Sequence, residues 1–249
     1  GVEREDFLAF TVVEDLEVYD TVAIGDQRLE ALHLQPCHSP IWDTSLLMNA
    51  LIETGMPQDH PVLQRAAAYL ISRQTKAIGD WIVSAPQAEP GGWYFQHENE
   101  LYPDVDDSAV VLMALAKVKM TDPASLQDSI RRGTAWVVAM QGSDGGWGAY
   151  DKDNNRIVFN YIPFADHHAL LDPSTADLSG RCLEMLAALG YDRTHPAVAP
   201  ALAFLKHEQE PDGSWYGRWG VNYIYGTWSV LAGLRAIRDL ESHLATIRR

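Results

Sequence analysis

The stretch Gln141-Gly-Ser-Asp-Gly145-Gly-Trp147 shares the pattern Gln-x-x-x-Gly-x-Trp with Gln209-Glu-Pro-Asp-Gly213-Ser-Trp215. A third copy, one residue longer, is formed by Gln74, Gly79 and Trp81. The three glutamines lie 67 and 68 residues apart. In each copy the Gln amide can bond loop backbone groups, and the Gly allows the turn that brings the Trp back onto it. We interpret the unit as a structural clasp, because a fixed period of this kind is typical of repeated helical architectures.

Two helices are expected between successive copies of this clasp. The first of each pair is almost wholly apolar, as in 110–115 and 183–189, so it should be buried all round, whereas the second carries charges and should keep a wet face. The expected helices are 45–52, 60–74, 107–119, 125–140, 177–189, 195–208 and 227–239. Inner helices ringed by outer helices predict an all-α fold, an incomplete α6/α6 barrel or α/α toroid of repeated hairpins.

The repeats cover 36–240, and we expect the chain to be one catalytic α/α-barrel domain over 1–249, truncated relative to a longer parent. Residues 1–35 form a poorly patterned lead-in, in which helices over 6–18 and 27–34 are expected. The loops 75–106 and 142–176 are too long to be simple connections, so they are expected to wall a cavity at one end of the toroid.

The composition excludes several classes of function. A net charge of −15 argues against nucleic acid and against purely electrostatic docking to anionic lipid. Cys37 and Cys182 are the two cysteines, which fits reduced thiols in a cytosolic compartment and gives no disulfide framework or zinc spacing. No apolar run approaches the roughly 20 residues that span a bilayer, and the amino terminus does not resemble a signal peptide.

An acidic cluster precedes the most apolar helix, in Tyr102-Pro-Asp104-Val-Asp106-Asp107-Ser108. One interpretation is a charged helix cap, since Pro103 ends the preceding segment and Asp106 or Asp107 is a natural N-cap whose side-chain oxygen can accept the first free amides. The functional interpretation starts from crowding. Three carboxyl groups this close cannot all ionise cheaply in a shielded site, so one can stay protonated at neutral pH and act as a proton donor.

The cluster and the clasps together, with Asp212-Gly-Ser-Trp-Tyr-Gly-Arg-Trp-Gly-Val-Asn-Tyr-Ile-Tyr-Gly-Thr227, resemble the squalene–hopene cyclases, which are bacterial class II triterpene cyclases related to the oxidosqualene cyclases. The resemblance runs from about residue 36 to 240 and includes 39–44, 91–95, 160–164 and 172–177. Members of that family are longer and have two α/α barrels. This chain therefore resembles most of the catalytic barrel.

The resemblance implies which residues start the reaction. Asp106 would protonate an alkene, with Asp104 and Asp107 holding its proton in the reactive orientation. Many family members place a His where this sequence has Arg181, which would anchor the spent carboxylate as a permanent cation. Guanidinium cannot return a proton, so reprotonation would run instead through water near Tyr150 or Tyr225.

The resemblance also implies the substrate and its surroundings. Squalene would be cyclised to hopene, with some hopanol formed by water, in hopanoid biosynthesis and without any cofactor. Aromatic π faces would stabilise the carbocations. The candidates are Trp42, Phe95, Tyr150, Phe164, Trp219 and Tyr225, although an aromatic stripe is often simply core. The longer parent would be a monotopic protein on the cytoplasmic face of the bacterial inner membrane, with a homodimer left open. The fragment would be soluble and inactive by itself.

Other functions stay open on the residues alone. Paired acids and many Trp residues also suit an (α/α)-barrel glycoside hydrolase, with Asp166 or Asp172 as the second carboxylate. A non-catalytic helical-repeat scaffold is a third possibility. A protein-prenylation relative would need a zinc set, and neither Cys has such neighbours. His167 and His168 lie beside Asp166 without metal-ligand spacing, and no phosphate-binding glycine loop is present.

Overall fold

The protein is described by a computed structural model over residues 19–24, 27–32, 39–162 and 170–238. Seven α-helices lie in these ranges, and each overlaps one expected helix. They are α2 (Pro40–Glu53), α3 (Pro61–Ser72), α4 (Val105–Leu115), α5 (Pro123–Ala139), α6 (Ala176–Ala188), α7 (Val198–His207) and α8 (Asn222–Ala236). The short 3-10 helices η2 (Asp80–Val83) and η3 (Ile157–Tyr161) lie in the two long loops.

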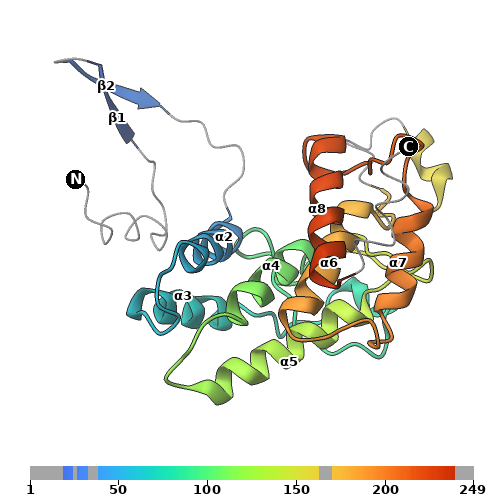
Figure 1. Ribbon diagram of the computed structural model, residues 1–249, viewed down its shortest axis with the longest axis horizontal. Helices are drawn as coiled ribbons and strands as arrows, with labels where there is room; N and C mark the ends of the chain where they lie inside the picture. Colours follow the sequence, from blue (N-terminus) through green and yellow to red (C-terminus); the bar gives the residue numbers. More distant parts are fainter. Residues whose placement is uncertain (1–18, 25–26, 33–38, 163–169, 239–249) are drawn as a thin grey trace.

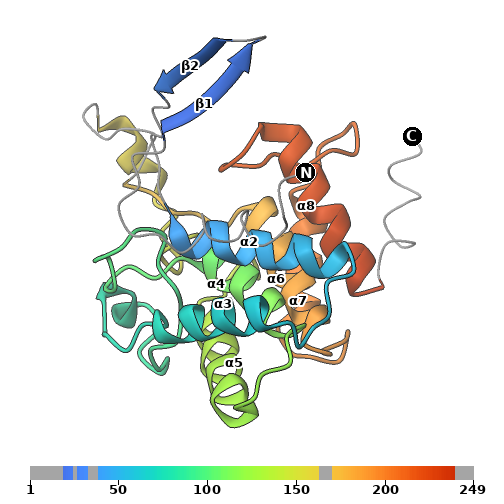
Figure 2. The same ribbon diagram turned by 90° about the vertical axis from the view of Figure 1, so that its left-hand side faces the viewer.

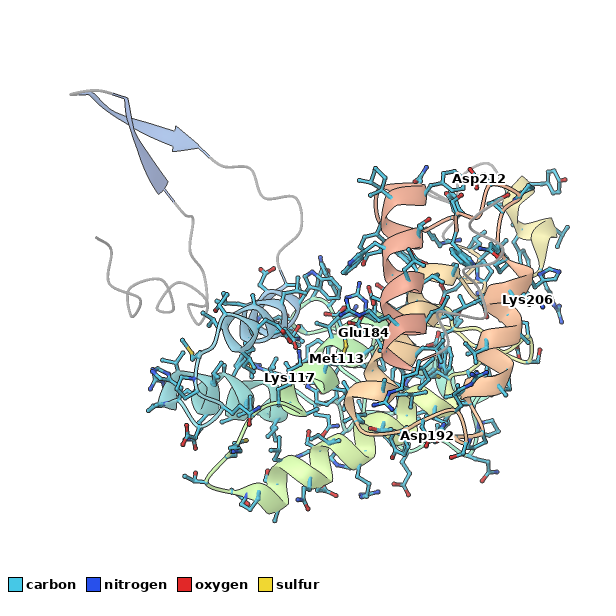
Figure 3. All side chains as sticks on the ribbon, viewed as in Figure 1. Met113, Lys117, Glu184, Asp192, Lys206 and Asp212 are labelled. Atoms are coloured by element: carbon cyan, nitrogen blue, oxygen red, sulfur yellow. The ribbon has the colours of Figure 1, made fainter. Side chains whose placement is uncertain are left out.

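The helices form two layers, as Figures 1 and 2 show. Helices α2, α4, α6 and α8 contact one another in that order and make the inner row, whereas α3, α5 and α7 each pack on the inner helix before them. Side chains fill the space between the layers, and the exposed Asp192 and Lys206 lie at the periphery (Figure 3). The expected toroid is therefore confirmed as an arc of inner and outer helices.

Burial follows the position of each helix in the arc. In α4, ten of eleven residues are buried, and Asp106 is the exception. Helix α6 also buries ten of its thirteen residues, while the outer helix α5 buries one face. Helices α2 and α8, at the two ends of the inner row, bury only four and five residues. The prediction that inner helices are buried all round is thus confirmed for α4 and α6. It is wrong for α2 and α8, which among the described helices have an inner neighbour on one side only.

Each repeat is closed by the expected clasp between a glutamine and a tryptophan. Trp147 donates from Nε1 to the carbonyl of Val137 at 2.7 Å, and Gln141 donates from Nε2 to Gly145 and Ala197. Gly145 has a φ of +92°, which glycine adopts without strain. Since Ala197 precedes α7, the Gln141 amide ties the end of α5 to the next outer helix.

The first clasp uses Trp93 rather than the expected Trp81. Trp93 donates from Nε1 to Leu70, and Gln74 donates to Gly91 and Ser129, so these residues repeat the bonding pattern of the later copies. Trp81 instead packs edge-to-face on Trp136 at 6.1 Å. The loop after Gln74 carries an insertion that moves the functional Gly-x-Trp to 91–93, and a search at fixed spacing finds the wrong tryptophan.

Two strands precede the helices. β1 (Tyr19–Ile24) and β2 (Gln27–Leu32) pair antiparallel, with Ile24 opposite Gln27. The prediction of a helix over 27–34 is wrong there, because Gly25-Asp26 between two short segments is a hairpin signal. The all-α prediction therefore holds for the repeats but not for 19–32. The expected helix over 6–18 lies outside the described residues.

None of the helices in the described ranges combines the length and apolar composition that a bilayer crossing needs.

Candidate active site

The repeats place three side chains at equivalent positions. The backbone N–H of each clasp tryptophan donates to a hydroxyl on the next inner helix, which is Ser108 for Trp93, Ser179 for Trp147 and Thr227 for Trp215. The residues two positions before these hydroxyls are Asp106, Asp177 and Tyr225. Because α4, α6 and α8 are neighbours in the inner row, this register brings the three side chains to the same end of the arc.

The acidic cluster is both a helix cap and a crowded set of buried carboxyl groups. The N-cap of α4 is Asp104 and not the expected Asp106 or Asp107, because the helix begins at Val105; Oδ1 of Asp104 accepts the N–H of Asp106 at 2.6 Å and of Asp107 at 3.2 Å. Asp104 and Asp107 are buried, and the Asp106 side chain is 14% exposed. Oδ1 of Asp106 and Oδ1 of Asp107 accept no hydrogen bond from the described residues.

Burial shifts all three acids toward the protonated form. Desolvation, with the charge of Asp106, raises the pKa of Asp104 to about 7. Desolvation also raises the pKa of Asp106, which Arg181 opposes and Asp177 reinforces. The pKa of Asp107 lies well above its ordinary value because the side chain is desolvated and faces Asp104 and Asp106. The crowding expected from the sequence is therefore present.

Arg181 on α6 faces this cluster from the neighbouring inner helix. Its Nε lies 3.2 Å from Oδ1 of Asp106, and its Nη2 donates to the hydroxyl of Tyr225 at 2.7 Å. Desolvation alone would lower the pKa of Arg181, but Asp106 and the other acidic neighbours raise it, so the guanidinium stays charged. Arg181 is 4% exposed, so it is not a solvated residue on the surface of its helix.

Tyr150 approaches Asp104 from the long loop after α5. Burial and the nearby charge of Asp104 raise the pKa of the Tyr150 hydroxyl, so it stays protonated, and its ring packs edge-to-face on Trp219 at 6.2 Å. The buried Asp172 accepts the backbone N–H of Tyr150 at 2.6 Å and of Asp151 at 2.7 Å through Oδ2. Asp172 therefore fixes the backbone from which Tyr150 extends.

The other expected residues are placed less centrally. Trp42 on α2 and Tyr225 on α8 both lie near Arg181, with its Cζ 5.8 Å and 5.9 Å from their ring centroids. Phe95 is half-buried in the loop between α3 and α4. Phe164, together with Asp166, His167 and His168, lies outside the described residues. Within the described ranges, no group of three His, Cys, Asp or Glu side chains could hold a metal ion.

Two residues of the site were not predicted. Asp177 is buried in the first turn of α6 and accepts the backbone N–H of Trp219 at 3.1 Å. Its position relative to Ser179 matches that of Asp106 relative to Ser108, which is the sequence signal that could have found it. Trp228, one helical turn after Tyr225, lies over the Arg181 guanidinium at 5.3 Å.

Comparison with solved structures identifies the class of fold. A type II terpene cyclase from Scytonema superposes with a TM-score of 0.53 at 18% identity, covering 83% of this chain and 54% of that protein. The same cyclase in complex with geranylgeranyl dihydroxybenzoate gives a TM-score of 0.52 at 16% identity, over 83% and 53% of the two chains. The arc of inner and outer helices therefore has the fold of part of that α/α toroid.

The sequence itself carries the assignment further. Residues 38–249 match the squalene-hopene cyclase C-terminal domain, and the chain belongs to this family. The squalene–hopene cyclase of Zymomonas mobilis is 45% identical over 241 residues, 96% of this chain and 36% of that enzyme. That of Bradyrhizobium diazoefficiens is 47% identical over 216 residues, 86% of this chain and 32% of that enzyme. The chain spans about a third of the length of these relatives.

The family assignment decides between the functions that the residues left open. It supports the cyclase and favours neither a glycoside hydrolase nor a scaffold. Asp172, the described candidate for a second glycosidase carboxylate, has Oδ2 occupied by two backbone N–H groups.

Proposed function

We propose that the parent protein of this chain cyclises squalene to hopene and some hopanol, and that Asp106 donates the proton that starts the reaction. The observation that carries the proposal is the mostly buried carboxyl of Asp106, which has a raised pKa, two neighbouring acids and one cation 3.2 Å away. An unactivated alkene needs a strong acid shielded from water, and such an arrangement supplies one. The named activity of the relatives supports the same reaction.

In this mechanism each polar neighbour has a separate role. Asp104 and Asp107 keep the proton of Asp106 oriented toward the substrate. When a terminal carbon of squalene takes that proton, Asp106 becomes a carboxylate, and Arg181 stabilises the new charge because it is already paired with Oδ1. Arg181 cannot resupply the proton, so water near Tyr150 or Tyr225 returns it.

The growing carbocation is stabilised by aromatic rings. The edge-to-face pair of Tyr150 and Trp219 presents π faces beside the acid cluster, and Phe95 extends the wall in the loop between α3 and α4. Loss of a proton gives hopene, and capture of water gives hopanol. The enclosed cavity that this requires stays a prediction. No cofactor takes part, since both the proton and the charges come from side chains.

We further propose that residues 1–249 belong to one catalytic barrel and that this chain alone does not turn over squalene. Among the described elements, each end helix of the inner row contacts one inner neighbour, which supports a remaining wall supplied by the rest of the parent. The parent is proposed to be a monotopic membrane protein on the cytoplasmic face of the bacterial inner membrane, where it forms homodimers. Exposed apolar residues in η3, with Val158 at 66% and Tyr161 at 81%, support a contact with lipid.

The test is Asp106→Asn in the parent protein, assayed by gas chromatography of squalene products. Asn keeps the size of the side chain and cannot donate the proton, so cyclisation should fall below detection while the circular dichroism spectrum is unchanged. Asp59→Asn, an exposed acid between α2 and α3, is the matched control and should keep full turnover. Turnover retained in Asp106→Asn would refute the proposal.

A further inference from the structure

The guanidinium of Arg181 lies among three aromatic rings. Its Cζ is 5.3 Å from the ring centroid of Trp228, 5.8 Å from that of Trp42 and 5.9 Å from that of Tyr225. All three distances fall inside the roughly 6 Å within which a cation is attracted to a ring face. Trp42 comes from α2 and the other two from α8, so the rings approach from both ends of the inner row.

Trp228 is the nearest ring and has no role in the reaction so far. It is 52% exposed and packs on Tyr225 at 5.6 Å with an angle of 50° between the planes. The contact that distinguishes it is the one with Arg181.

The charge of Arg181 is held on two sides. Nη2 donates to Tyr225 and Nε faces Asp106, but Nε makes no hydrogen bond of standard geometry with the described residues. The ion pair with Asp106 therefore lacks the directional constraint of a hydrogen bond, and the rings that pack on the guanidinium contribute to its position. An Arg carries much rotamer freedom, which rings on its faces restrict.

We propose that Trp228 is a positioning residue that holds the guanidinium of Arg181 against Asp106. Trp42 and Tyr225 complete the same aromatic box, so these two rings bind an internal cation in addition to lining the site. Only the effect on turnover depends on the proposed function; the effect on Asp106 does not.

Several other groups face Asp106 and must stay constant in any test. Asp104 and Asp107 share the start of α4, and Asp43 on α2 acts on Asp107. The groups from the neighbouring helices are Arg181, Asp177 and Cys182 on α6 and Tyr225 on α8. Of these, Arg181 is the cation, and it lowers the pKa of Asp106. Loosening Arg181 should therefore raise that pKa.

The first experiment follows the carboxyl carbon of Asp106 by ¹³C NMR over pH in the chain labelled at aspartate. Trp228→Leu fills most of the space without a π face, and the titration midpoint of Asp106 should rise by roughly half a unit to one unit. Trp228→Phe keeps a π face and should leave the midpoint in place. Tyr223→Leu is the matched control, because this α8 ring is also about half exposed and pairs with Tyr216 instead.

A double-mutant comparison separates positioning from packing. In the Arg181→Gln background, Trp228→Leu should no longer move the Asp106 midpoint, because the cation through which it acts is gone. The ¹⁵N and ¹H shifts of Arg181 Nε give a second readout that needs no change at Arg181. They should lose the ring-current contribution in Trp228→Leu and keep most of it in Trp228→Phe. An unchanged midpoint in Trp228→Leu, or an equal shift in both backgrounds, overturns the proposal.

The second experiment measures squalene turnover by the parent. Trp228→Leu should lower kcat about five- to tenfold with KM unchanged, since a displaced Arg181 stabilises the spent carboxylate less well, and Trp228→Phe should restore most of the rate. A rise in KM at constant kcat would contradict the proposal. If the unaltered parent produces no hopene, the proposed function fails, while the NMR titration still decides the role of Trp228.

Discussion

Two buried tryptophans of one repeat should respond differently to the same substitution. Trp93 and Trp81 are both almost wholly buried, but Trp93 Nε1 donates to the carbonyl of Leu70 at 2.6 Å, whereas Trp81 Nε1 has no partner among the described residues. Replacing either by Phe removes the same atoms and leaves a similar cavity. The difference between the two variants therefore isolates the hydrogen bond.

The magnitude follows from that difference. Trp93→Phe loses a net hydrogen bond of about 1 kcal/mol, and Trp81→Phe removes a buried unpaired N–H whose desolvation costs about 1–3 kcal/mol. The Leu70 carbonyl still accepts the N–H of Arg73, so it is not left unpaired and the cost in Trp93→Phe stays modest. We expect Trp93→Phe to destabilise the fold by about 2–4 kcal/mol more than Trp81→Phe.

Urea unfolding followed by far-ultraviolet circular dichroism measures both free energies without relying on tryptophan emission. Trp147→Phe should group with Trp93→Phe, because its Nε1 makes the corresponding bond to Val137. Equal destabilisation by Trp93→Phe and Trp81→Phe would refute the reasoning that Trp93 closes the first repeat.

Three further changes test the repeat packing and the acid cluster. Gln141→Ala should lower the free energy of unfolding by about 1–3 kcal/mol, and Gln209→Ala should lower it by less. The Gln141 amide donates to Gly145 and Ala197, whereas among the described residues the Gln209 amide donates only to Gly213. Equal urea midpoints for the two variants would contradict this. Gly233→Ala should lower the free energy of unfolding by about 1–3 kcal/mol in the same assay, because the added Cβ would lie 2.2 Å from the carbonyl oxygen of Gly180. An unchanged free energy of unfolding would mean that α6 and α8 can move apart without loss of stability. The pKa of Asp104 is raised to about 7 in the folded state, so the folded protein binds a proton that the unfolded chain releases near pH 4. The contribution of this proton to the free energy of unfolding is fully present below pH 4 and is lost as the pH rises through 7. Asp104→Asn should therefore flatten the decrease in the free energy of unfolding between pH 4 and 8, and an unchanged slope would contradict the assignment.

The helices were predictable because their period and their caps agree. Pro61 and Pro123 occupy first-turn positions of α3 and α5, close to the expected starts of these helices. The expected start at residue 45 was wrong for α2, which begins at Pro40 because Ser39 caps it by accepting the N–H of Trp42. The hairpin over 19–32 was missed because its sequence has no strong period of either kind, and the Gly25-Asp26 pair between the strands was the informative signal.

The site was predictable where one residue type implies a chemistry, and not where the geometry decides. A cluster of three acids is recognisable in the sequence, and the resemblance predicted that Arg181 lies beside it. That Arg181 sits among rings from α2 and α8 depends on how the inner row curves, which no local pattern records. The shift of the first clasp from Trp81 to Trp93 likewise depends on an insertion whose folded path is not evident from spacing.

The repeat explains why the proposed donor is Asp106 and not the acid at the same position in the next unit. Asp177 is equivalent by its place before Ser179, but its Oδ1 accepts the N–H of Leu178 and its Oδ2 accepts the N–H of Trp219, both at 3.1 Å. Both oxygens of Asp177 are therefore engaged by backbone donors. Asp106 has Oδ1 directed at Arg181 and no backbone donor to it. The register of the repeat therefore supplies two acids to one end of the arc, and the hydrogen bonds that Asp106 lacks leave it able to carry and release a proton.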